Sequence, residues 1–240
     1  MALLAIGANH AAACANNTTR SLFGIDVSHY QGSVTWSSVY ADGARFAFCK
    51  ATEGTSYTDP DYSSNITHGK NQGLQMSSYH FAHPESNCPN PEADHYWNVA
   101  GGDLIADGKS LYPTLDVEVF SGNQCYSSLT AWCNQWSTRV KNKTSLFLHP
   151  VLYGARCNGM CYQTTACTLS AWVASYNGES LYTGDPWNSC QSCNYVSPNT
   201  NCGWTYWQAT STGSVSGVSG NCDLDAYNGT LANLKAWQGI

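Results

Sequence analysis

Short apolar runs rich in β-branched and aromatic residues recur along the chain and predict eight β-strands. These runs span residues 23–28, 45–52, 74–82, 112–120, 146–154, 171–176, 205–209 and, more weakly, 222–227. Helical patterns lie at 36–41, 60–72, 92–106, 129–140 and 231–237. Alternation of strands and helices predicts parallel strands joined by right-handed crossovers. Eight strands with about five helices predict an α/β fold, an incomplete β/α barrel.

We expect one barrel domain over residues 21–240. Residues 1–20 could be a signal peptide or an N-terminal extension, because an apolar segment at 2–8 precedes the small residues around Cys14. Residues 177–203 are rich in Gly, Pro, Asn and Ser and hold three cysteines, which predicts a loop held by disulfides.

Composition excludes several classes of protein. Charged residues make up only 11% of the 240 residues, the net charge is −6, and lysine and arginine do not cluster. We therefore expect neither disorder nor nucleic-acid binding. No apolar run reaches the roughly 18 residues of a membrane span, so we expect no membrane insertion.

Cysteines and glycosylation sequons indicate the cellular compartment in which the protein folds. The chain has 12 cysteines and five N-x-Thr sequons, at Asn16, Asn17, Asn65, Asn142 and Asn228. Together they favour an oxidising, secretory route and a disulfide framework over a zinc site.

Two acids lie in the otherwise apolar run 112–120. At alternate positions of a strand, Asp116 and Glu118 would share one face with Cα atoms roughly 6–7 Å apart. Like charges so close resist joint ionisation, which raises one pKa and leaves the other low. An acid coexisting with a carboxylate is what glycoside hydrolysis requires. The alternative is a solvated D-x-E on an exposed strand edge.

In such barrels the chemistry collects at the C-terminal ends of the strands. Acids predicted there are Asp26, Asp116, Glu118 and Asp223. Candidate substrate-binding residues are Tyr79, Tyr153, Trp172, Trp207 and Gln208, although each aromatic could equally be core. Asp26 and Asp223 could instead cap helices or pair with cations. Lys50 and Glu53 are as consistent with an internal ion pair as with substrate contacts.

Two histidines are also candidates, for metal binding. His29 and His80 belong to no H-x-x-H or H-E-x-x-H pattern. We therefore predict neither a metal nor a cofactor.

The ordered motifs resemble glycoside hydrolase family 25, the N-acetylmuramidase lysozymes. The similarity covers residues 22–230 and rests on segments 23–32, 50–54, 79–82, 116–118, 207–208 and 213–223. It implies a flattened barrel that cleaves the β-1,4 bond between N-acetylmuramic acid and N-acetylglucosamine in bacterial peptidoglycan. Separately from the resemblance, we expect a monomer. The resemblance also implies that Glu118 is the general acid/base. Asp116 would assist, through the substrate acetamido group or as a nucleophile, flanked by Asp26 and Asp223.

Cys49, Cys222 and Asp225 depart from the family pattern. If the barrel closes and brings their strands together, Cys49 and Cys222 could form a disulfide. An inactive carbohydrate-binding protein is the alternative function, and a chitin hydrolase is a weaker one. The acidic balance favours secretion into an acidic digestive compartment, since peptidoglycan is itself anionic.

Overall fold

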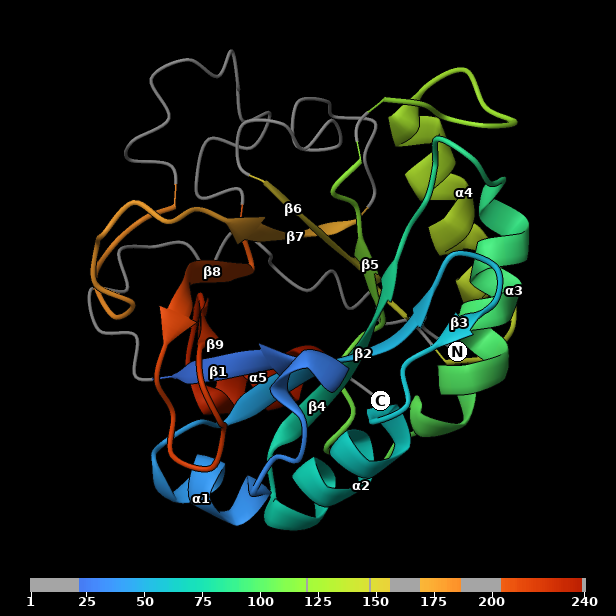
Figure 1. Ribbon diagram of the computed structural model, residues 1–240. Coiled ribbons are helices and arrows are strands. Elements are labelled where there is room, and N and C mark those ends of the chain that lie inside the picture. Colours follow the sequence, from blue (N-terminus) through green and yellow to red (C-terminus); the bar gives the residue numbers. More distant parts are fainter. Residues whose placement is uncertain (1–21, 120, 147, 156–168, 187–203, 239–240) are drawn as a thin grey trace, which may run out of the picture.

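Eight strands close into a barrel, as predicted (Figure 1). The computed structural model describes residues 22–119, 121–146, 148–155, 169–186 and 204–238. The strands follow the order β1-β9-β8-β7-β6-β5-β4-β2, and β1 also pairs with β2. They are β1 (Phe23–Val27), β2 (Phe46–Glu53), β4 (Gln75–Phe81), β5 (Thr114–Asp116), β6 (Val151–Ala155), β7 (Ser170–Ala174), β8 (Tyr206–Gly213) and β9 (Cys222–Tyr227). A short unpredicted strand, β3 (Tyr57–Thr58), pairs with the end of β2.

The last strand runs against the others. Strands β1, β2, β4, β5, β6, β7 and β8 are parallel to their neighbours in that series, whereas β9 is antiparallel to both β1 and β8. The prediction of parallel strands rests on strand–helix alternation and does not extend to β9, because no helix lies in the described segment between β8 and β9. The 214–221 connection is too short for a parallel return, which needs a crossover of a dozen or more residues.

Five α-helices occur among the described residues, close to the predicted positions. They are α1 (Trp36–Ala41), α2 (Tyr62–Gln72), α3 (Pro89–Ala100), α4 (Leu129–Lys141) and α5 (Leu231–Gln238), with 3₁₀ turns η2 (His29–Gln31) and η3 (Gly101–Asp103). Helices α3 and α4 pack together along one flank, and α2 covers β2 and β4 (Figure 1). Helix α3 begins earlier than predicted, at Pro89. Proline is tolerated there because a backbone N–H in the first turn of a helix makes no hydrogen bond within the helix.

Closure of the barrel requires a close approach between β1 and β2. Gly24 lies opposite Phe46, and a Cβ on Gly24 would come within 2.4 Å of the Phe46 ring. Only glycine fits this contact. Around it Phe46, Phe48 and Tyr206 form part of a buried aromatic cluster inside the barrel.

The disulfide pairing differs from the one predicted for Cys49 and Cys222. Cys88 and Cys125 form a disulfide, whereas Cys49 and Cys222 are buried and unbonded. Strand β1 lies between the strands that carry Cys49 and Cys222. Two strand spacings amount to about 9–10 Å, which exceeds the Cα separation of roughly 7 Å that a disulfide can span. The predicted Cys49–Cys222 bond is therefore wrong.

Other predictions fall outside the described residues. These include the N-terminal extension at 1–20 and most of the cysteine-rich loop at 177–203. No helix in the described part of the chain is long and apolar enough to cross a bilayer.

Candidate active site

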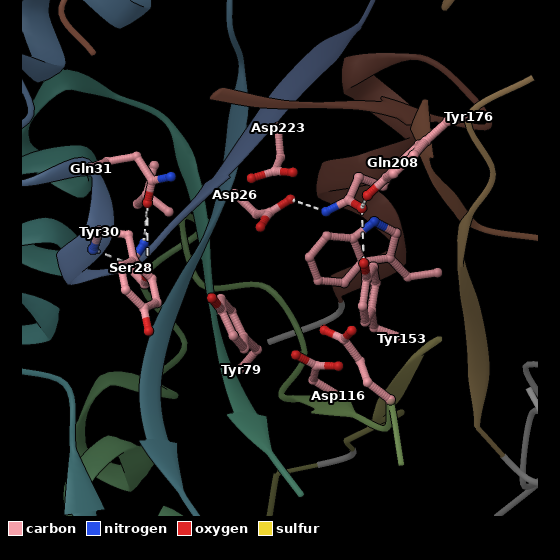
Figure 2. Close-up of a pocket in the computed structure, with 13 residues that line it drawn as sticks. Asp26, Ser28, Tyr30, Gln31, Tyr79, Asp116, Tyr153, Tyr176, Gln208 and Asp223 are labelled. Carbon is pink, nitrogen blue, oxygen red and sulfur yellow. Dashed lines mark hydrogen bonds between the residues drawn. The ribbon is translucent and has the colours of Figure 1, made fainter. Parts of the chain in front are cut away.

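Four predicted acids meet in one cavity of about 250 Å³ at one end of the barrel (Figure 2). Asp26 comes from β1 and Asp116 from β5, and Glu118 follows β5 by two residues. Asp223 is near the start of β9, which reaches the same end because β9 is antiparallel. The cavity is lined by Asp26, Val27, Ser28, Tyr30, Gln31, Tyr79, Asp116, Glu118, Tyr153, Trp172, Tyr176, Gln208 and Asp223.

Glu118 is not on a strand, contrary to the prediction. Strand β5 ends at Asp116, although the Val117 N–H still donates to the Tyr153 carbonyl at 3.0 Å. The chain then leaves the sheet, so that Asp116 is buried and Glu118 is exposed to solvent while lining the cavity. Glu118 is thus the carboxyl group that an incoming ligand can most easily reach.

Burial raises the pKa values of all four acids, and repulsion from neighbouring acids adds to this for Asp26, Asp116 and Asp223. Burial, followed by repulsion from Glu118 and Asp26, raises the pKa of Asp116 well above its usual range. Burial, followed by repulsion from Asp223, raises the pKa of Asp26, and burial together with Glu118 raises the pKa of Asp223 to about 6. Burial in the cavity also raises the pKa of Glu118. The cluster therefore retains protons at pH values where ordinary carboxyl groups are ionised.

Lys50 is the cation that acts on this cluster. Its ammonium group lowers the pKa of both Asp116 and Glu118, against the effect of burial. Lys50 Nζ also forms an ion pair with Glu53 Oε2 at 2.6 Å. The internal ion pair that the sequence left open is therefore present.

Gln208 lies at the centre of a hydrogen-bond network. Its Nε2 donates to Asp26 Oδ2 at 2.6 Å, and its Oε1 accepts from the hydroxyls of Tyr153 at 2.8 Å and Tyr176 at 2.6 Å. Gln208 lines the cavity, but its amide is already engaged by protein groups. It therefore orients Asp26 in the unliganded protein.

The predicted aromatic residues divide into three groups. Tyr79 and Tyr153 line the cavity. Trp172 also lines it, but Phe48 stacks against its ring at 4.0 Å between centroids, and only 2% of the residue is exposed. Trp207 is outside the cavity, fully buried, with its indole N–H donating to the Ser175 carbonyl at 2.8 Å. The proposed sugar contact by Trp207 is thus corrected: its side chain points to the opposite face of β8 from Gln208.

Two exposed aromatics at the cavity are not among the predicted substrate-binding residues. Tyr30 is 82% exposed and Tyr176 is 57% exposed. Tyr30 belongs to η2, whose backbone is fixed by reciprocal hydrogen bonds between Ser28 and Gln31. The position of these residues just beyond the ends of β1 and β7 was the available signal, because loops at that end of a barrel form the site.

The two histidines have structural partners. His80 is buried between Thr52 and Glu92, at 2.7 Å and 2.9 Å, and burial lowers its pKa. His29 Nδ1 lies 2.8 Å from Asp59 Oδ2. Within the described residues, no group of three or more His, Cys, Asp or Glu side chains is arranged to hold a metal ion.

An exposed acid beside buried acids, with aromatics exposed nearby, can donate a proton to a glycosidic oxygen and stabilise the resulting charge. Barrel and site together define a glycoside hydrolase. The model of the family 'Glycosyl hydrolases family 25' matches residues 25–218, and the chain belongs to this family.

Relatives extend over most of the chain. Lysozyme M1 of Streptomyces globisporus is 36% identical over 227 residues, which cover 91% of this chain and 71% of that protein. An N,O-diacetylmuramidase of Chalaropsis sp. is 38% identical over 138 residues, covering 54% and 64%. The crystal structure of the bacterial lysozyme from Streptomyces coelicolor superposes with a TM-score of 0.73 and 34% identity, covering 91% of this chain and 97% of that one.

Proposed function

We propose that this protein hydrolyses the β-1,4 bond between N-acetylmuramic acid and N-acetylglucosamine in bacterial peptidoglycan. The observation that carries the proposal is the meeting of Asp26, Asp116, Glu118 and Asp223 in one cavity. The names of the relatives, lysozyme and N,O-diacetylmuramidase, support this substrate.

Glu118 is the general acid/base in this proposal. Its raised pKa favours the protonated form that a general acid needs, and its exposure lets it reach the bridging oxygen of the substrate. Glu118 first gives its proton to the leaving sugar. As a carboxylate, it then takes a proton from the water that completes hydrolysis.

Asp116 assists through the substrate's acetamido group. Its Oδ1 is buried and has no hydrogen-bond partner among the described residues, so it can accept the acetamido N–H. The acetamido oxygen then attacks the anomeric carbon as the glycosidic bond breaks, and water later reopens the ring so formed. This substrate-assisted route is an established variant of the two-carboxylate scheme.

The position of the proton is the main requirement of this mechanism. In the free protein, burial favours a proton on Asp116, whereas catalysis needs the proton on Glu118 and a charge on Asp116. An N–H donated by the bound sugar stabilises the charged form of Asp116. Substrate binding therefore shifts the proton towards Glu118.

Glu118→Gln and Asp116→Asn test these roles. We expect Glu118→Gln to lower kcat by about two to four orders of magnitude, with KM little changed, because the amide cannot transfer the proton. Clearing of bacterial cell-wall suspensions gives the rate, and Asp61→Asn, outside the cavity, is the control. Wild-type turnover by Glu118→Gln would overturn the assignment.

The alternative is an inactive carbohydrate-binding protein on the same scaffold. Such a protein would bind cell walls without releasing sugar ends. Product analysis of digested peptidoglycan separates the two, and a muramic acid at the new reducing end distinguishes a muramidase from a glucosaminidase.

The setting we propose is secretion into an acidic compartment. The Cys88–Cys125 disulfide supports an oxidising route. The raised pKa values of the cavity acids and the net charge of −6 both favour acidic conditions on an anionic wall. An activity optimum above about pH 7.5 would contradict this setting.

A further inference from the structure

A fifth carboxyl group, Asp225, lies directly behind the cavity. It is on β9 two positions after Asp223, so both side chains point to the same face of the sheet. It pairs in register with Gln208 on β8 and Gly24 on β1. Asp225 is fully buried and does not line the cavity.

The two oxygens of Asp225 have different surroundings. Oδ1 accepts the indole N–H of Trp172 at 2.8 Å. Oδ2 is buried and receives no N–H or O–H from the residues that the structure describes. Asp225 pairs with Gly24 and Asp223 pairs with Asp26, so the side chains of Asp225 and Asp26 are diagonal neighbours on one face of the β1–β9 ladder. Two carboxyl groups so placed can form a hydrogen bond only when one of them carries a proton.

Asp26 is the better site for the negative charge. Its Oδ2 already accepts the Gln208 Nε2–H at 2.6 Å, and the residue reaches the cavity. In the described part of the chain, no lysine, arginine or histidine forms an ion pair with Asp26 or Asp225. A second charge on Asp225 would therefore have no compensation.

We propose that Asp225 works as a protonated positioning residue, whose carboxyl O–H donates to Asp26 and fixes that carboxylate in the active site. The indole of Trp172 holds Oδ1 of Asp225, which leaves the buried Oδ2 as the oxygen that carries the proton for Asp26. In this proposal the bond from Asp225 adds to the one that Asp26 accepts from Gln208, and the two together fix the rotamer of Asp26. Its role in hydrolysis rests on the proposed function.

The surrounding charges favour the same proton position. Burial, followed by repulsion from Asp26 and Asp223, raises the pKa of Asp225. The other titratable groups that face Asp26 or Asp225 are Asp223 and Cys222 on β9, Asp116 on β5, Glu118 after β5, Cys49 on β2, Tyr79 on β4, Tyr153 on β6 and Tyr176 after β7. Each is neutral or anionic, so none of them stabilises a second charge.

Two variants separate positioning from simple packing. Asparagine at position 225 keeps a donor for Asp26 and an acceptor for Trp172, whereas leucine keeps similar bulk and loses both. We expect Asp225→Leu to lower kcat by about one to two orders of magnitude with KM little changed, because Asp26 is no longer held. Asp225→Asn should restore most of that loss. Equal loss in both variants, each folded by its thermal transition, would overturn the proposal.

Infrared spectroscopy tests the proton itself, without reference to activity. We expect the difference spectrum between the full-length wild-type chain and Asp225→Asn at neutral pH to contain the C=O band of a protonated carboxyl group. An ionised carboxylate band in its place would overturn the proposal even if Asp225→Leu fails to fold. If the band is present but the wild-type protein releases no sugar ends, the proposed function fails and the Asp225–Asp26 pair stands.

Discussion

Gln208 Nε2 donates a 2.6 Å hydrogen bond to Asp26 Oδ2, joining two residues that are 182 positions apart in the chain. Gln208 is on β8 and Asp26 on β1, with β9 between them in the sheet. The bond is therefore a side-chain contact across β9 and not part of the backbone pairing between neighbouring strands. It ties the first strand of the barrel to one of its last at the active site.

Gln208→Leu should weaken both activity and stability. It removes the donor to Asp26 and leaves the hydroxyls of Tyr153 and Tyr176 without their acceptor. We expect kcat to fall by about one to two orders of magnitude and the free energy of unfolding to fall by about 1–3 kcal/mol. Wall clearing and urea unfolding measure these changes. Thr212→Ala, on the exposed end of β8, is the control, and equal effects in both variants would contradict the prediction.

Asp223 makes stability depend on pH. Its pKa rises from 3.8 to about 6 on folding, chiefly through burial and then through Glu118. The folded state thus holds this proton more tightly than the unfolded state, and the stabilisation is lost as pH rises from about 4 to 6. Asp223→Asn should therefore raise Tm at pH 7 and change it little at pH 4. Calorimetry at the two pH values measures this, and an equal shift at both would contradict it.

The strands could be predicted from the sequence because a barrel strand is buried on both faces and therefore appears as a continuous apolar run. The sequence could not give the direction of β9, because alternation of side chains is the same in either direction. The length of the 214–221 connection was the usable signal. Likewise, the 112–120 run reads as one strand, although the sheet ends at Asp116 and Glu118 lies beyond it.

The candidate site was predictable only in part. The four acids follow from the motifs, and their meeting follows from strand ends that share one edge. Trp207 and Gln208 are neighbours on β8, and only one of them can face inward. The hydrogen bond between Gln208 and Asp26 depends on barrel closure between distant segments. No local pattern encodes it.

The disulfide arrangement gives a chemical test of the fold. Peptide mapping without reduction should recover a Cys88–Cys125 linkage and no Cys49–Cys222 linkage. The Cys88–Cys125 bond joins the start of α3 to the loop before α4. Replacing both by serine should lower the free energy of unfolding by about 2–4 kcal/mol. Cys133→Ala, at an unbonded cysteine, is the control, and recovery of a Cys49–Cys222 peptide would contradict the barrel order.

Glycosylation should distinguish the three sequons that the structure describes. A glycan attaches to the side-chain amide and must extend into solvent. Asn142 is exposed at the end of α4. Asn65 is 3% exposed and accepts the Trp36 indole N–H at 3.3 Å, and Asn228 is 7% exposed and donates to the Trp204 carbonyl at 3.2 Å.

Protein secreted from a eukaryotic host should therefore carry a glycan at Asn142 and none at Asn65 or Asn228. Peptide mass spectrometry reads each site separately, and Asn142→Gln is the matched control that removes this glycan. Wall-clearing activity should not change in that variant, because α4 packs against α3 and Asn142 does not line the cavity. A glycan on Asn65 in folded, active protein would be incompatible with the buried contact to Trp36, since that amide cannot be substituted and packed at once.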